Sequence, residues 1–280
     1  MIEHNAGDLT AVVSADTRLS ELQSLVGKAG QMLALDPPGD PSLGEAILSN
    51  ASGPLRHRYG SLRDLVLGVR VRLPDGTEAK AGGKVIKNVA GYDLAKLYIG
   101  SQGSLGEVLE ASVRLHPLPR VTRTSVLRSS DPDVLQAAAL DLSHRPLELL
   151  SLDVRWDGTE EMLLARVARD EAVLEEPVED EDVVWKRQRE GQTSGDVMVR
   201  VSGLQTQLAD VLRFGARVVG RAGLGLYWVE TDDVDALRGA VAPSPCVVVE
   251  APEGFAGDRH GAVEQGALEL MRRVRERFAA

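Results

Sequence analysis

The stretch GGKVIKNVAGYDLAKLYIGSQGSLGEV, residues 82–108, combines a high density of glycine with apolar residues at the spacing of a protein core. It lacks the Lys-Ser/Thr ending of a phosphate-binding P-loop. A helix-like piece at residues 92–98 precedes the G-x-x-G-x-x-G run of residues 100–106, and a strand-like alternation follows, whereas a Rossmann site needs the reverse order. We interpret the run as a loop whose backbone approaches a ligand, with clustered N–H groups forming an anion-binding nest. The alternative is that these glycines only make turns.

The composition is that of a globular chain with room for one large or two ordinary domains. The chain has 280 residues, of which 43% are hydrophobic and 26% are charged, so it can bury a core. Its net charge is -10, with a pI near 5.1. Nucleic acids and anionic membrane surfaces attract basic proteins, so neither is expected as the main partner.

Several kinds of chemistry are absent from the sequence. The single cysteine, Cys246, lies in an apolar run typical of a buried strand, and one thiol cannot hold an iron–sulfur cluster. The five histidines are scattered, no paired metal-ligand spacing occurs, and no nucleophile elbow is present, so no metal site is expected. No apolar stretch has the length of a membrane helix and no signal peptide is visible, which makes a cytoplasmic location the default. An enzyme of this kind would depend on a cofactor.

Hydrophobic patterning divides the chain near Pro119. Before it, alternating residues predict strands at 67–73 and 109–115, and a helix is expected at 19–29. After it, strands and helices alternate, which predicts a second α+β domain. There we expect a helix carrying Leu204, Leu208, Val211, Leu212 and Val219, a solvated acidic loop at 175–183, and a last helix whose apolar face holds Leu268, Met271, Val274 and Phe278.

Three segments in this order carry a resemblance: DPPGDPSLGE at residues 36–45, NASGPLRHRYGSLRD at 50–64, and the opening stretch. Together they resemble the FAD-binding domain of the vanillyl-alcohol-oxidase/p-cresol-methylhydroxylase flavoproteins, and in particular the branch of FAD-binding subunits of bacterial glycolate oxidases. The likeness is dense over the first 119 residues and loose beyond them. It implies an α+β chain: residues 1–119 as a partial two-subdomain FAD-binding domain that lacks its N-terminal subdomain, and residues 120–280 as an α+β, ferredoxin-like cap domain.

The resemblance also implies which residues meet FAD. The first segment would supply Pro38, Gly39, Ser42 and Gly44. The second would supply Asn50, Ser52, Gly53, Tyr59, Gly60 and Ser61. The third would supply Gly103, Ser104, Gly106 and Val108. Catalytic residues are not determined, and the candidates in the opening stretch are Lys87 and Tyr92, with surface and packing roles as the alternatives.

The implied activity is oxidation of a small 2-hydroxy acid, such as glycolate or D-lactate, by hydride transfer to the flavin. The implied partners are a larger FAD-containing subunit and an iron–sulfur subunit, through which the complex could attach to the inner membrane.

Three departures from the family pattern favour an alternative. No pyrophosphate-cradling glycine loop precedes residue 2, Glu45 replaces a usual glycine where a carboxylate would repel a diphosphate, and no Asn-Pro-Gly-type tail follows Phe278. A flavin-free scaffold or electron-relay subunit therefore stays open beside the flavoprotein reading. A nicotinamide-dependent enzyme is a third possibility, with no Rossmann unit to support it.

Overall fold

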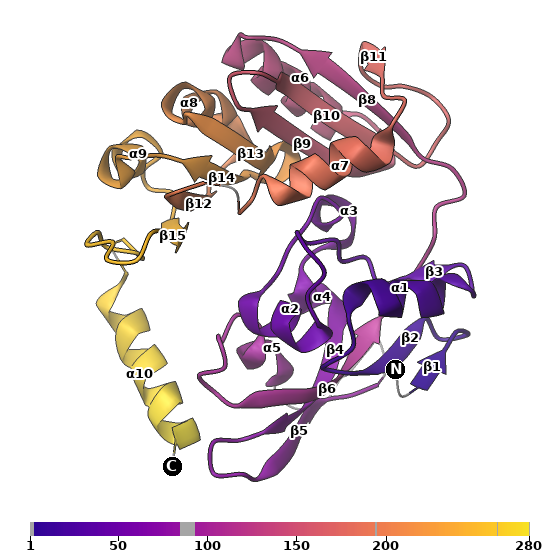
Figure 1. Ribbon diagram of the computed structural model, residues 1–280, viewed down its shortest axis with the longest axis vertical. Coiled ribbons are helices and arrows are strands. Elements are labelled where there is room, and N and C mark those ends of the chain that lie inside the picture. The colour runs from indigo at the N-terminus through magenta and orange to yellow at the C-terminus, as the bar shows by residue number, and fades with distance from the viewer. Residues whose placement is uncertain (1–2, 85–92, 194, 262, 280) are drawn as a thin grey trace. The chain divides into compact units, whose positions relative to one another are not determined.

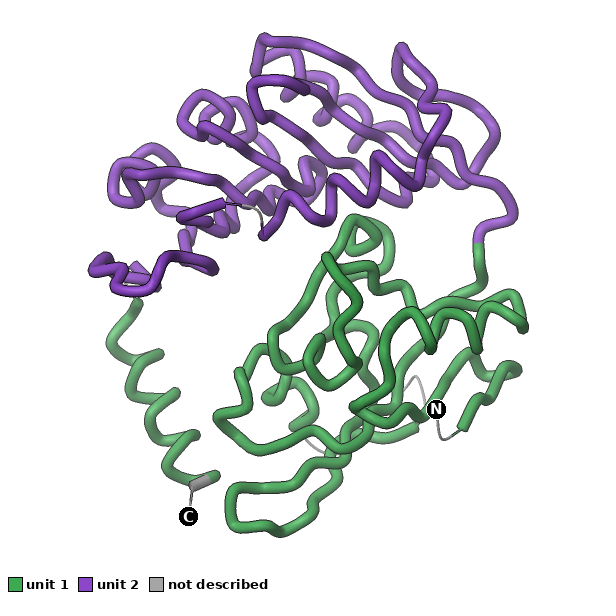
Figure 2. The backbone as a smooth tube through the Cα atoms, in the orientation of Figure 1, with its two compact units in different colours: residues 1–118, 263–280 green, residues 119–262 purple. Residues whose placement is uncertain are grey.

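The chain folds into two compact units, each with its own hydrophobic cluster. The computed structural model describes residues 3–84, 93–193, 195–261 and 263–279 (Figure 1). Unit 1 comprises Met1–Leu118 together with Val263–Ala280, and unit 2 comprises Pro119–Ala262 (Figure 2). Lys87 and Tyr92 lie outside the described residues. Within the described ranges, none of the helices combines the length and the apolar character needed to cross a membrane.

Unit 1 is built on a five-stranded antiparallel sheet in the order β1-β2-β6-β4-β5, with a separate two-stranded sheet of β3 and β7. One face of the large sheet is apolar and packs against the helices. Charged side chains cross the strands on the other face, where Arg70 pairs with Glu78 at 3.0 Å and with Glu110 at 3.2 Å. The elements are β1 (Glu3–Asn5), β2 (Thr10–Ser14), α1 (Leu19–Gly27), β3 (Gln31–Met32), α2 (Leu43–Ser49), α3 (Arg56–Tyr59), α4 (Leu62–Leu65), β4 (Val66–Arg72), β5 (Glu78–Gly82), α5 (Ala95–Tyr98), β6 (Glu107–Arg114), β7 (His116–Pro117) and α10 (Gln265–Ala279).

A bulge changes which side chains of β6 face the core. The simple alternation of the sequence places Leu109 inside. The register with β4 shifts between Arg70 and Val71, and Val108 is buried instead while Leu109 is only half-buried. An extra residue in one strand reverses the alternation beyond it, which a count along the sequence does not reveal.

Helix α10 packs on unit 1 through part of its expected apolar face. Val274 and Phe278 contact the core of unit 1, and the Phe278 ring meets the Tyr98 ring edge to face with centroids 6.2 Å apart. Leu268 and Met271, predicted on the same face, are 51% and 54% exposed. The expectation for this helix is thus right for two of its four residues.

Unit 2 is an eight-stranded antiparallel sheet in the order β11-β8-β10-β9-β13-β14-β12-β15. Two β-α-β-β units make up its centre, β8-α6-β9-β10 and β12-α8-β13-β14, and they meet where β9 pairs with β13. The expected α+β class is confirmed in this form. The elements are β8 (Arg123–Arg128), α6 (Pro132–His144), β9 (Leu149–Trp156), β10 (Glu161–Val167), β11 (Glu176–Pro177), α7 (Glu181–Glu190), β12 (Met198–Ser202), η1 (Gln205–Gln207), α8 (Leu208–Phe214), β13 (Arg217–Arg221), η2 (Ala222–Leu224), β14 (Leu226–Glu230), α9 (Val234–Ala240) and β15 (Cys246–Glu250).

Helices cover the two faces of this sheet unequally. Helices α6, α8 and α9 share the large hydrophobic cluster on one face. On the opposite face α7 lies over β8 and β10, where Trp185 packs against Val126, Met162 and Leu164 (Figure 1). The Trp185 indole N–H donates to Thr124 Oγ1 at 2.9 Å, which satisfies both groups in a buried position.

Three expectations for unit 2 need comment. The helix predicted through Val219 ends at Phe214, because Gly215 breaks it and Val219 belongs to strand β13. The acidic run 175–183 is not one solvated loop, since it contains β11 and the start of α7, and the Glu181 carboxylate accepts the Thr124 N–H at 2.6 Å. Cys246 is a buried strand residue as predicted, and its burial raises the pKa of the thiol.

Two glycines offer a matched test of unit 1. An added Cβ at Gly53 would overlap the carbonyl oxygen of Asp36, whereas one at Gly27, at the end of α1, meets nothing within 4 Å. We expect Gly53→Ala to lower the free energy of unfolding by about 3 kcal/mol or more, because backbone must move. Gly27→Ala should change it by at most about 1 kcal/mol, in the stabilising direction. Urea denaturation measures both, and equal stabilities would contradict the close crossing at Gly53.

Candidate functional site

The first two segments of the motif meet at Asp36. Its carboxylate accepts the Leu55 N–H at 2.9 Å, and Gly53 lies so close to the Asp36 backbone that no side chain fits there. Gly53 is therefore required by the crossing of two chain segments. The turn that precedes α2 is thereby held against the loop that follows α2.

The third segment meets the C-terminal end of α2. The Gly100 and Gln102 N–H groups donate to the carbonyls of Ile47 and Leu48, at 2.9 Å and 3.0 Å. A Cβ at Gly100 would lie 3.3 Å from that of Asn50. Asn50 ends α2 in the left-handed conformation that such helix ends favour. All three motif segments thus converge around α2.

The amides of the glycine run do not form an open anion nest. Five of its N–H groups donate to backbone carbonyls, so they are already satisfied. These are the N–H groups of Gly100, Ser101, Gln102, Ser104 and Gly106. The turn-making alternative describes this run better, since Gly100, Gly103 and Gly106 have positive φ angles of 79°, 76° and 125°. A ligand here would meet side chains more than free backbone N–H groups.

The side chains of this region carry every buried polar atom of unit 1 that lacks a hydrogen-bond partner among the described residues. Buried polar atoms are paired in the great majority of cases, so a cluster of unpaired ones indicates the place of a ligand. The atoms are Asn50 Oδ1, Ser52 Oγ, His57 Nδ1, Ser101 Oγ and His116 Nε2. Asn50 and Ser52 were expected from the motif, whereas Ser101, His57 and His116 were not.

The residues not predicted from the sequence differ in how far a sequence pattern could have indicated them. Ser101 lies inside the glycine run, so the sequence motif could have included its hydroxyl among the predicted cofactor-binding groups. His116 is recognisable only in three dimensions. Its ring lies 4.7 Å from the ring of Tyr59, although strands β4, β5 and β6 separate the two residues in the sequence. No periodicity links two such positions.

The polar cluster fits the chemistry of FAD. The cofactor carries a pyrophosphate, ribityl hydroxyls and a ring with both donors and acceptors. The hydroxyls of Ser52 and Ser101 can donate or accept, and the Asn50 amide offers both functions. These three side chains would hold the cofactor in unit 1.

Other motif residues have structural duties. Ser42 begins α2 and Ser61 begins α4, each with a capping box that satisfies helix N–H groups. Gly60 has a φ of 83° and lies against Asp64. Val108 faces the core of unit 1. These residues are needed for the conformation of the loops and for packing. A cofactor contact at any of them stays a prediction.

The remaining motif residues line the loops in different ways. The Gly44 N–H donates to the Ala15 carbonyl at 2.7 Å, so its amide is satisfied, and Pro38 is half-buried. Gly39 and Gly103 are exposed, have positive φ angles and leave open space where a Cβ would stand. The Ser104 hydroxyl donates to the Ser101 carbonyl at 2.7 Å.

Glu45 is engaged by its own helix. Its carboxylate accepts the Ser42 N–H at 2.7 Å and lies 3.8 Å from Arg18. The hydrogen bonds from Ser42 lower the pKa of Glu45, with Arg18 adding to the effect. The charge therefore serves as the N3 half of a capping box. Glu45 therefore stabilises α2, a role that its replacement of a glycine in the family pattern does not predict.

The two histidines of the cluster are held neutral. Burial lowers the pKa of His57, and the nearby Arg58 lowers it further. Burial likewise lowers the pKa of His116, with Arg114 and Arg58 contributing. At neutral pH both imidazoles are therefore uncharged.

Comparison with known proteins agrees with the motif reading. Residues 1–82 match the family model described as FAD binding domain. Glycolate oxidase subunit GlcE of Escherichia coli (strain K12) is 36% identical over 125 residues, which cover 44% of this chain and 36% of that protein. The mitochondrial D-lactate dehydrogenase (cytochrome) of Arabidopsis thaliana is 36% identical over 113 residues, 40% of this chain and 20% of that protein. The chain thus spans little more than a third of these relatives at most.

A solved structure supports the fold. Alkyldihydroxyacetonephosphate synthase superposes with a TM-score of 0.60 at 14% identity, covering 98% of this chain and 64% of that one. Residues 1–82 thus carry an FAD binding domain of the p-cresol-methylhydroxylase/vanillyl-alcohol-oxidase type, and the superposition supports the fold of the chain.

The capping role of Glu45 is testable by two substitutions. Glu45→Gly removes the capping side chain, so we expect a lower melting temperature. Glu45→Gln keeps a side chain that can reach the Ser42 N–H, so the melting temperature should stay near that of the wild type. If both variants instead keep full stability and gain FAD affinity, repulsion of the diphosphate is the main effect of Glu45.

The neutral histidines predict a pH dependence of stability. In the unfolded chain histidine titrates near pH ~6.5. Below that pH the unfolded chain binds protons at His57 and His116 more readily than the native state does, because their pKa is lowered in the native state. The free energy of unfolding therefore falls as the pH drops from about 7 to 5. His116→Gln should flatten this slope, measured by urea denaturation across that range. The exposed His260→Gln is the control, and an unchanged slope in His116→Gln would contradict the assignment.

Proposed function

We propose that this chain is the FAD-binding subunit of a 2-hydroxy-acid oxidase or dehydrogenase complex. Unit 1 would belong to the FAD-binding domain, and unit 2 would be the cap on the substrate side. The observation that carries the proposal is the cluster of unpaired buried polar atoms at Asn50, Ser52 and Ser101 in a domain matched to FAD-binding proteins.

The flavin would supply the acceptor for the hydride that leaves the carbon bearing the hydroxyl group. The chain's own residues would bind and orient the cofactor. The neutral imidazoles of His57 and His116 would offer hydrogen-bonding nitrogens, Nδ1 and Nε2, without adding charge to the site. A glycolate- or D-lactate-type substrate is supported by the relatives, which include a glycolate oxidase subunit and a D-lactate dehydrogenase.

The proposed assembly pairs this chain with a larger FAD-containing subunit and an iron–sulfur subunit. Support comes from the likeness to a glycolate oxidase subunit and from the single cysteine, which leaves iron–sulfur chemistry to another chain. A cytoplasmic location, with attachment to the inner membrane through partners, follows from the same proposal. Affinity purification from the native host should recover both proteins in fixed ratio, and their joint absence would contradict this assembly.

Flavin binding has a direct test with matched serine variants. The purified chain, soaked with FAD and desalted, should show the flavin absorption bands. Ser52→Ala and Ser101→Ala should each weaken FAD binding roughly tenfold, as expected for one hydrogen bond to a charged or polar group. Ser49→Ala is the control, because its hydroxyl donates to the Glu45 carbonyl on an exposed part of α2. Equal affinity in all three variants would refute the cluster as the FAD site.

The alternative is a flavin-free scaffold or electron-relay subunit. The capping role of Glu45 and the satisfied loop amides favour it, because neither contributes to holding a diphosphate. The substitution Gly103→Asn distinguishes the flavin-binding subunit from the flavin-free one. Asparagine tolerates a positive φ and fits the open space there, so the fold should survive while a bound cofactor against this loop would be displaced. A wild-type chain without flavin bands after soaking would establish the alternative.

A further inference from the structure

The centre of the unit 2 sheet contains a fully buried ion pair. Arg221 at the end of β13 and Asp153 in β9 are both completely inaccessible to solvent. Arg221 Nη1 donates to Asp153 Oδ2 at 2.7 Å. The two strands are neighbours, and the pair lies one step beyond the Gly220–Val154 pair of their ladder. It lies on the face of the sheet that α7 also covers.

The guanidinium of Arg221 keeps one complete edge without a partner. Its Nε and Nη2 atoms are buried and make no hydrogen bond within the described part of the chain. These two N–H groups point the same way and form the fork that matches the two oxygens of a carboxylate. A buried guanidinium edge left unpaired is costly, so it indicates where a ligand binds.

More nitrogen donors lie near this edge. Arg155 Nη2 and Gln192 Nε2 are also buried without a partner among the described residues. Arg155 stands opposite Val219 on β13, two residues before Arg221. The end of α7 reaches the same place, because a Cβ at Gly191 would lie 2.7 Å from Val219 Cγ1. One acceptor, Gln188 Oε1 of α7, is also buried without a partner among the described residues, but the nitrogens predominate and suit a ligand with several acceptor oxygens.

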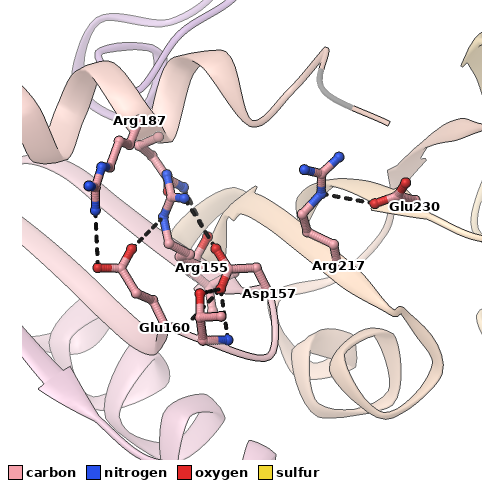
Figure 3. Close-up of polar contacts among 9 residues, drawn as sticks. Arg155, Asp157, Glu160, Arg187, Arg217 and Glu230 are labelled. Carbon is pink, nitrogen blue, oxygen red and sulfur yellow. Dashed lines mark hydrogen bonds and ion pairs between the residues drawn. The ribbon is translucent and has the colours of Figure 1, made fainter. Parts of the chain in front are cut away.

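The acidic side chains near this edge are already engaged by arginines. Asp157 and Glu160 are engaged with Arg155 and Arg187, at 3.4–3.8 Å (Figure 3). Glu230 lies 3.0 Å from Arg217 (Figure 3). Each of these acids already has an arginine beside it, and Asp153 has Arg221.

Arg200 is a cation of this face that has no acidic partner among the described residues. It makes no hydrogen bond or ion pair with any residue that the structure describes, it is half-buried, and burial lowers its pKa. It stands opposite Trp228 in the ladder, and Trp228 stands opposite Val219. Arg221 stands two residues beyond Val219 on β13, so this row of side chains neighbours the position of Arg221 on the same face.

An apolar surface adjoins the donors. Met198, Val219, Leu226 and Trp228 form one buried cluster on this face. The Arg221 guanidinium carbon lies 5.0 Å from the centre of the Trp228 ring. Charged hydrogen bonds are stronger beside such a surface than in water.

We propose that this face of the sheet binds the carboxylate of a small organic acid. The Nε–Nη2 edge of Arg221 takes the two carboxylate oxygens, Arg200 supplies the balancing positive charge, and Trp228 bounds the site on its apolar side. The choice of a 2-hydroxy acid as ligand rests on the proposed function, while the site itself is defined by unit 2 residues and does not require flavin.

The experiment titrates the full chain with glycolate and with D-lactate, using calorimetry and tryptophan fluorescence. Glycolamide, which has the same shape and no charge, is the probe for the carboxylate. We expect glycolate to bind and glycolamide to bind at least about tenfold more weakly, the loss typical of a charge-assisted pair. Equal binding of the two compounds, or none of glycolate or D-lactate, would overturn the proposal.

Two arginine variants locate the site. Arg200→Gln should weaken glycolate binding roughly tenfold, because it removes this positive charge without leaving a buried anion unpaired. Arg213→Gln is the matched control, since Arg213 is a half-exposed arginine of α8 that pairs with Asp133 and Asp210. Wild-type affinity in Arg200→Gln, or equal losses in both variants, would refute the assignment.

The buried pair is tested by the double variant Asp153→Asn/Arg221→Gln, which removes both charges and leaves neither uncompensated. Glycolate binding should be lost, and Trp228→Phe should remove the fluorescence change. FAD retention is measured on the same samples by absorption. Glycolate binding by a chain that takes up no flavin would support this inference and refute the proposed flavoprotein, and flavin uptake without glycolate binding would do the reverse.

Discussion

The close passage of Gly53 over the backbone of Asp36 is the constraint on which unit 1 depends. It lets the Asp36 carboxylate accept the Leu55 N–H, and so ties the turn before α2 to the loop after it. The C-terminal end of α2 then receives the N–H groups of Gly100 and Gln102. The first two motif segments can cross because Gly53 has no side chain, and the third joins them through its hydrogen bonds to the end of α2.

The unpaired atoms of the two units have opposite characters, and this suggests different tasks. In unit 1 they belong to hydroxyls, an amide oxygen and two imidazole nitrogens, a mixed set that suits a ligand with many donors and acceptors. At the centre of the unit 2 sheet they are mostly guanidinium and amide nitrogens, which suit an anion. A net charge of -10 does not conflict with such a site, since local donors decide what binds there.

Unit 2 also shows how a duplicated pattern can yield two unlike halves. Both β-α-β-β units place their first helix on the same face, and α6 and α8 pack together there. The helices that follow them diverge. Helix α7 covers the opposite face through Trp185, whereas Leu237 of α9 joins the cluster of α6 and α8. On the face that bears Arg221 and Trp228, the half under α7 is therefore built differently from the half formed by β12, β13 and β14.

The sequence by itself determined the FAD-domain motif, the α+β class and most strands, because loop chemistry and alternation are local properties. It predicted Asn50 and Ser52 in the candidate site for the same reason. Only the tertiary structure decided that the loop amides are already paired, that Glu45 caps its own helix, and that a bulge turns Val108 inward. It alone brought Tyr59 to His116 and Arg221 to Asp153. Such contacts join residues separated by whole strands and helices, and they depend on sheet register and packing, which no local pattern encodes.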